Sequence, residues 1–177
     1  MSLKIGKNMP RILLQACFFL FSVFLLGCAP TVPQGAAFKP LAAPDAADTL
    51  VYVYRQDSLR GLSAVDLELD GENLGPLLNG EYLAFLLDPG SHELRARMKW
   101  LQMIPRSWNS LEFKSRPGQT IYLRVWGAYE KGAKPIPTGL DIAQPSNENA
   151  KVGLFLGIQK PEIAETELKT MRRATGR

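Results

Sequence analysis

The 177-residue chain has few of the residues that catalytic and metal sites most often use, with one His and two Cys. Two cysteines are too few for a disulfide-dense scaffold or a Cys-rich zinc site. A single imidazole excludes a His-pair metal site and leaves no spare member for a nucleophile–histidine constellation. Only one long apolar run is present, which excludes a multi-span membrane protein. With 46% hydrophobic and 21% charged residues, the chain is otherwise typical of one globular domain.

The single apolar run covers residues 12–26 and follows three basic side chains, Lys4, Lys7 and Arg11. Its 15 residues are fewer than the roughly 20 that a helix needs to cross the hydrocarbon core of a bilayer. A basic start followed by a short apolar stretch predicts a secretory signal over residues 1–27. An uncleaved membrane anchor is the alternative.

The run ends in Leu25-Leu26-Gly27-Cys28, which resembles the lipobox of bacterial lipoproteins. The resemblance implies a diacylglycerol on the Cys28 thiol, cleavage between Gly27 and Cys28, and acylation of the new amine. More than one acyl chain gives stable anchoring without a transmembrane helix. Ala29, next in the chain, resembles the signal for outer-membrane sorting. An ordinary signal peptide followed by a free or buried Cys28 thiol is the alternative.

Cleavage at this position changes the charge of the chain. The precursor carries +4, from 21 basic and 17 acidic residues, and loss of three basic residues leaves the mature chain near +1. A nucleic-acid-binding function loses its main support, because it needs a basic surface to neutralise phosphates. Cys17 would be removed with the signal and the Cys28 sulfur would carry the lipid, so the mature chain would have no thiol left for catalysis or disulfides.

Residues 28–47 are rich in Pro and Ala and show neither strand-like alternation nor a helical stripe. We expect an extended tether that holds the folded domain away from the bilayer. An N-terminal strand is the alternative, disfavoured by prolines that lack a backbone donor, namely Pro30, Pro33, Pro40 and Pro44.

From residue 48 onward the pattern changes to short strands separated by turn dipeptides. Residues 63–70 alternate apolar and acidic side chains, as a half-exposed strand does, and the dipeptides Asp70-Gly71 and Asn79-Gly80 favour tight hairpins. Seven or eight short strands before one helix predict a mainly β, antiparallel β-sandwich domain over residues 48–177. The predicted strands cover residues 49–55, 63–70, 73–78, 82–87, 91–101, 108–114, 120–128 and 151–158.

A helix is predicted after Pro161, which suits a first helical turn. Ala164, Leu168 and Met171 form an apolar stripe, and acidic residues 162 and 165 precede basic residues 169, 172 and 173. We expect this helix to cover a sheet face or an open edge. Residues 130–150 form the longest predicted loop and are the first place to look for a partner surface.

Residues 50–94 contain VYVYR and then VDLELDGENLGPLLNGEYLAFLLDPGSHEL. This stretch resembles a family of bacterial envelope lipoproteins with a domain of unknown function of the DUF2846 type. It also resembles, more loosely, the PEGA-type β-sandwich, an immunoglobulin-like arrangement. The resemblance implies a fold and an envelope location, and it brings no activity with it.

Carboxylates cluster at alternate positions of the predicted strand 63–70 and just after it: Asp66, Glu68, Asp70 and Glu72. Such a cluster is consistent with a cation site or a glycosidase pair, whereas spacing by two on a half-exposed strand favours a solvated face. If the strands adjoin, Glu68 can pair with Arg95 or Arg97. His92, directly after a Pro-Gly turn, is interpreted as a strand-entry residue that caps this turn by hydrogen bonding.

Tyr122, Arg124 and Trp126 share one face of the predicted strand 120–128, opposite an aliphatic face. If the aliphatic face packs in the core, these three side chains form an outward stripe suited to a sugar or a protein partner. The alternative, which we favour, is that a helix or a second sheet buries the stripe.

Together these patterns predict a lipid-anchored, non-enzymatic binding or structural module at the periplasmic face of the outer membrane, without a cofactor. Its expected partners are the membrane, through the anchor, and another envelope protein or cell-wall glycan. Two alternatives remain open: a small envelope hydrolase that uses carboxylates within 66–72, and a surface-exposed adhesin-type lipoprotein.

Overall fold

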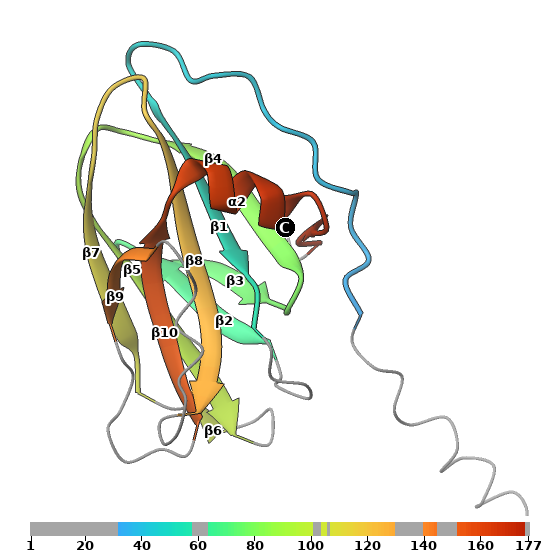
Figure 1. Cartoon of the computed structure of the whole chain (residues 1–177). Coiled ribbons are helices and arrows are strands. Elements are labelled where there is room, and N and C mark those ends of the chain that lie inside the picture. The colour runs from blue at the N-terminus through green and yellow to red at the C-terminus, as the bar shows by residue number, and fades with distance from the viewer. Residues whose placement is uncertain are drawn as a thin grey trace, which may run out of the picture. The chain divides into compact units, whose positions relative to one another are not determined.

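The computed structural model describes residues 32–57, 64–100, 104–105, 107–129, 140–144 and 152–175. All of these belong to one compact unit, Val32–Arg177. Two β-sheets face each other, and one helix lies on the outer side of the first sheet (Figure 1). This arrangement confirms the predicted mainly β sandwich with a C-terminal helix. The predicted signal and Cys28 lie outside the described residues.

The first sheet, sheet A, has the strand order β11-β4-β1-β8-β10-β9. Its strands are β1 (Thr49–Arg55), β4 (Glu81–Leu87), β8 (Thr120–Tyr129), β9 (Leu140–Gln144), β10 (Val152–Gln159) and β11 (Arg172–Arg173). Most neighbours are antiparallel, but β1 runs parallel to β8, with Leu50 opposite Thr120, and β11 runs parallel to β4. All seven residues of β1 are buried, as expected for a central strand covered on both faces.

The second sheet, sheet B, contains β2 (Val65–Leu69), β3 (Glu72–Leu77), β5 (Gly90–Trp100), β6 (Ile104–Pro105) and β7 (Asn109–Ser115). β2 lies between β3 and β5, while β7 and β6 pair with successive parts of the other edge of β5. The two predicted turn dipeptides end the strands before them, because Asp70, Gly71 and Gly80 have positive φ angles of 50°, 86° and 85°.

The core lies between the two sheets and is aliphatic. β2 alternates buried and half-buried residues, so Val65, Leu67 and Leu69 face the core as the sequence pattern predicts. They meet inward-facing residues of both sheets, including Val51, Val53, Leu94, Leu111, Leu123, Val125, Leu154 and Leu156.

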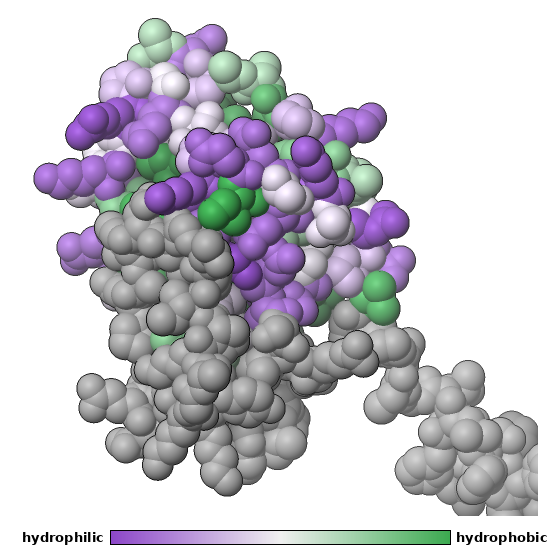
Figure 2. All heavy atoms as spheres, in the orientation of Figure 1, coloured by the Kyte–Doolittle hydropathy of each residue, from purple (hydrophilic) through white to green (hydrophobic). Residues whose placement is uncertain are grey.

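Helix α2 (Pro161–Leu168) covers the outer face of sheet A. Ala164, Leu168 and Met171 are buried against an aromatic cluster, which confirms the predicted apolar stripe. The cluster consists of Tyr52, Tyr54, Tyr82 and Tyr122, with Leu50, Phe38 and Ala84 around it. The side of the molecule that bears α2 is mainly hydrophilic (Figure 2), since the helix turns its polar residues outward.

The helix is shorter than the sequence pattern predicts, because the basic residues 169, 172 and 173 were expected near its C-terminal end. It ends at Leu168, and Arg172 and Arg173 instead form β11 at the edge of sheet A. There the Arg172 and Ala174 amides donate to the carbonyls of Gly80 and Tyr82, at 3.0 and 2.9 Å. The bonds satisfy the carbonyls of Gly80 and Tyr82, which would have no partner in the sheet if the helix continued through residues 172–174.

The prediction that residues 28–47 form a free tether is wrong for residues 33–41, which we call the docked segment. Its backbone pairs with β11: Arg173 N donates to Ala36 O at 2.8 Å, and Phe38 N donates to Met171 O at 3.0 Å. Phe38 also packs edge-on against Tyr52 and Tyr82. Gly35 is buried so close to β11 that a side chain there would overlap the Arg173 carbonyl. The prolines are tolerated because this is an edge position, where carbonyls accept and few donors are needed.

The predicted loop 130–150 is interrupted by β9, which pairs with β10 and forms one edge of sheet A. The rest of the predicted loop lies outside the described residues. Its proposed role as a partner surface therefore stays a prediction.

A buried ion pair joins the two sheets at the end of β1. Arg55 Nε lies 2.8 Å from Asp57 Oδ2, and both side chains are fully buried. Arg55 Nη1 donates to the Leu77 carbonyl of sheet B at 3.1 Å, and Asp57 Oδ2 accepts the Gly127 amide of sheet A at 3.3 Å. Asn79 closes the arrangement through two bonds to the Asp57 backbone.

Arg55→Met is expected to destabilise the protein by about 3–5 kcal/mol, because it leaves the Asp57 carboxylate buried without its cation. Arg95→Met, which removes the partner of partly exposed Glu68, should cost about 1 kcal/mol or less. Urea unfolding of both variants measures this difference. Equal losses would show that the Arg55–Asp57 pair does not hold the sheets together.

Candidate functional site

The predicted stripe of Tyr122, Arg124 and Trp126 is buried, with 6%, 9% and 4% of each residue exposed. Helix α2 covers its first part, because Tyr122 donates to Glu165 and Arg124 contacts Glu167. Trp126 stacks on Phe155 at a centroid distance of 5.4 Å. The expectation that these three side chains form an outward partner surface is therefore wrong, and the alternative of burial holds.

Arg124 organises the polar contacts beneath α2. Its guanidinium forms an ion pair with Glu167 and donates to the Gln56 carbonyl at 3.0 Å. The second oxygen of Glu167 accepts a hydrogen bond of 2.7 Å from the Tyr54 hydroxyl. One carboxylate of α2 thus serves two strands, and it fixes the helix on sheet A by charge as well as by apolar contact.

Burial raises the pKa of the Tyr54 phenol well above its usual value, and the hydrogen bond to Glu167 raises it further. Burial likewise raises the pKa of Tyr122, with a smaller contribution from Glu165. Both phenols stay protonated in the folded protein at a pH where an exposed tyrosine ionises.

The carboxylates predicted as a possible catalytic or cation-binding cluster do not converge on one site. Asp66 and Glu68 point to the outer face of sheet B and pair with basic residues of β5, and the predicted pair of Glu68 with Arg95 is confirmed at 2.9 Å. Arg97 and Lys99 both contact Asp66, at 3.2 and 2.8 Å. Within the part of the chain that the structure describes, no group of three or more His, Cys, Asp or Glu residues is placed to hold a metal ion.

The same face of sheet B carries a tryptophan that contacts two arginines of β5. The guanidinium carbons of Arg97 and Arg95 lie 4.3 and 5.1 Å from the centroid of the half-buried Trp108 ring. We call this array the Trp108 face, formed by Asp66, Glu68, Arg95, Arg97, Lys99 and Trp108. The alternation of basic and apolar side chains along β5 was visible in the sequence. The position of Trp108 next to the arginines depends on the pairing of β7 with β5.

His92 caps the turn that leads into β5, as predicted. Its Nδ1 lies 2.6 Å from Asp70 Oδ2, and its Nε2 lies 2.9 Å from the Asp88 carbonyl oxygen. Asp70 Oδ1 also accepts the Glu93 amide at 2.8 Å. Since both ring nitrogens face acceptors, only the doubly protonated ring donates to both.

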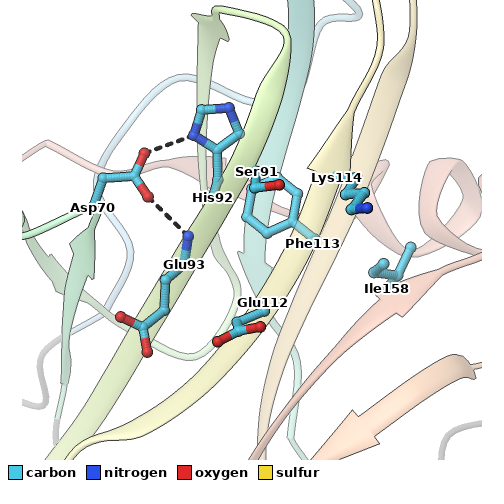
Figure 3. Close-up of a pocket in the computed structure, with 8 residues that line it drawn as sticks. All are labelled: Asp70, Ser91, His92, Glu93, Glu112, Phe113, Lys114 and Ile158. Atoms are coloured by element: carbon cyan, nitrogen blue, oxygen red, sulfur yellow. Dashed lines mark hydrogen bonds and ion pairs between the residues drawn. The ribbon is translucent and has the colours of Figure 1, made fainter.

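An open pocket of about 700 Å³ lies beside this turn (Figure 3). His92 and Asp70 are directed at each other rather than into the pocket, as the dashed contacts in Figure 3 show. The lining mixes charges of both signs with two apolar side chains: Asp70, Ser91, His92, Glu93, Glu112, Phe113, Lys114 and Ile158. The polar groups of the turn stabilise the start of β5.

Two features bear on membrane attachment: a helix that could span a bilayer, and the predicted lipidation of Cys28. Among the described residues, no helix has the length and apolar character needed to span a bilayer. The prediction of lipidation at Cys28 falls outside those residues and stays a prediction.

A family model for proteins of unknown function, DUF2846, matches residues 45–134, from the approach to β1 through the end of β8. The chain belongs to this family. No curated protein and no solved structure matches the chain. The matched region includes the Arg55–Asp57 pair and the whole Trp108 face, whereas α2 and the docked segment lie outside it.

The raised phenol pKa values predict a loss of stability at alkaline pH. An unfolded tyrosine ionises near pH 10, and the folded phenols ionise later, so their contribution is complete below about pH 10 and decreases as pH rises. Tyr54→Phe should lower stability at neutral pH and flatten this alkaline decrease. Urea unfolding between pH 8 and 11 compares the two proteins, and parallel curves would contradict the assignment.

Trp126→Ala should destabilise the protein by about 3–5 kcal/mol, because it removes a buried ring stacked on Phe155. Trp108→Ala should cost about 1 kcal/mol, since the ring is only half-buried and its main contacts are cation–π. Thermal and urea unfolding of this matched pair measure the contrast. Similar losses in both variants would place Trp108 in the core.

Proposed function

We propose that the protein is a lipid-anchored, non-enzymatic module at the periplasmic face of the bacterial outer membrane, where it binds another envelope protein. The Trp108 face is the binding surface. The observation that carries this proposal is the pair of arginines, Arg95 and Arg97, over the half-buried ring of Trp108 on the outer side of sheet B.

The composition of this array supports protein recognition. Trp and Arg are enriched among residues that dominate binding energy at interfaces. Asp66 and Glu68 hold Arg95 and Arg97 in place before any partner arrives, which lowers the side-chain entropy lost on binding. Glu93 and Glu112 lie next to the three cations and two carboxylates of this face, so the surface carries charges of both signs and a partner with a complementary mixture fits best.

The same ion pairs favour binding over hydrolysis. A general acid or base needs access to substrate and a proton that it can exchange. The carboxylates of Asp66 and Glu68 are instead engaged by β5 cations, with 15% and 17% of their side chains exposed.

The lipid anchor is supported by the lipobox-like residues that end at Cys28 and by the basic, apolar signal before them. With two acyl chains on the glycerol and one on the amine, Cys28 would hold the domain stably at a bilayer. The intact mass of the protein purified from a bacterial membrane tests this point directly.

Photo-crosslinking in living cells tests the binding surface. A photoreactive amino acid in place of exposed Glu112, on β7 beside the Trp108 face, should give a covalent adduct of defined mass. The same amino acid in place of exposed Thr166, on α2, is the matched control and should give little or none. Trp108→Ala should reduce the adduct at position 112, and Cys28→Ser should release the protein from the membrane fraction.

Mass spectrometry of the adduct then identifies the partner class. A peptide adduct supports the proposal, whereas an adduct that a glycan hydrolase removes points to cell-wall glycan instead. Equal adducts at both positions, or an unchanged yield in Trp108→Ala, would overturn the assignment of the Trp108 face.

A further inference from the structure

The docked segment shortens the connection between Cys28 and the folded domain. A free tether over residues 28–47 would let the domain move far from the bilayer, at about 3 Å per residue. Since Ala36 and Phe38 are hydrogen-bonded to Arg173 and Met171, Gly35 is the first buried position among the residues that the structure describes, seven residues after Cys28. Seven residues span at most about 25 Å even when fully extended.

The surface beside this short connection is basic. Exposed cations surround the place where the docked segment meets β11, and we call them the β11 edge: Lys39, Lys169, Arg172 and Arg173. Lys39 follows Phe38, which pairs with Met171, and Lys169 follows the last residue of α2. All four therefore lie beside the segment that leads to the anchor proposed at Cys28.

The four cations of this edge outnumber the acidic side chains near it. Glu81, next to β11 on β4, is buried and accepts the Leu78 amide. Glu165 and Glu167 face Tyr122 and Arg124. Asp48 precedes Thr49, which pairs with the far end of β4.

We infer that the β11 edge lies against anionic phospholipid headgroups of the bilayer to which Cys28 is attached, so that the anchor and the edge together fix the orientation of the sandwich. This inference rests on the proposed lipid anchor. Guanidinium groups bind phosphate in a bidentate manner, and each basic residue near an anionic surface strengthens membrane association about fivefold. The Trp108 face belongs to the other sheet and stays available to a protein partner.

Lysine footprinting on vesicles tests the orientation. Residues 28–177 contain the whole compact unit and a single thiol, Cys28, which couples to a maleimide lipid. The vesicles contain phosphatidylcholine with either 30% or no phosphatidylglycerol. On anionic vesicles, a water-soluble acylating reagent should modify Lys39 and Lys169 about fivefold more slowly than on neutral ones, while exposed Lys114 on β7 should react equally on both. Equal rates at all three lysines would overturn the inference.

Two variants test separately the charge of the β11 edge and the attachment of the docked segment. Arg173→Glu should restore fast labelling of Lys169, whereas the matched control Arg116→Glu, in the β7–β8 turn, should leave the protection unchanged. Gly35→Ala, which displaces the docked segment from Arg173, should weaken the protection while the sandwich stays folded. Protection that survives both Arg173→Glu and Gly35→Ala would also overturn the inference.

The outcomes distinguish this inference from the proposed function. The vesicle experiment supplies the anchor chemically, so it reports on orientation whether or not the cell acylates Cys28. A native protein without acyl groups would overturn the proposed anchoring, and an unprotected β11 edge on anionic vesicles would overturn the orientation alone.

Discussion

The buried pair of Arg55 and Asp57 is the interaction on which the geometry of this sandwich depends. Removing two charges from water is costly, and breaking such a pair is costly as well, because it leaves one charge buried alone. Here the guanidinium reaches a carbonyl of sheet B while the carboxylate accepts an amide of sheet A. The pair therefore sets how the two sheets meet at one end, and with Asn79 it fixes the turn from which β4 and the edge beside it begin.

Local chemistry allowed much of the fold to be predicted. Residues 49–55 and 82–87 are strands because their β-branched and aromatic side chains suit a buried sheet, and the Asp-Gly and Asn-Gly turns supply the positive φ that ends a strand. The alternation over 63–70 placed Val65 in the core and Glu68 opposite Arg95. The role of His92 as a cap of the turn was predicted from its position directly after Pro-Gly. Each of these features depends on residues within one hairpin or one pair of neighbouring strands.

Features that depend on distant residues were not predictable in this way. The face shared by Tyr122 and Arg124 was clear from parity, but what covers it is a helix that starts 37 residues after Arg124. The docked segment has the composition of a free tether, and only the unpaired side of β11 and the tyrosine pocket for Phe38 make it part of the fold. The Trp108 face likewise needed the register of β7 against β5, which no single stretch of sequence contains.

The parallel pairing of β1 with β8 has a consequence for how the chain reaches its native state. The central strand of sheet A finds one neighbour in β4 and the other about 70 residues downstream, at Thr120. Contacts between such distant residues make folding slow, because a long loop must close before they form. Sheet A also lacks its outer cover until α2 and β11 are available. A chain that ends before β8, α2 and β11 therefore lacks the partners that sheet A needs to reach its final form.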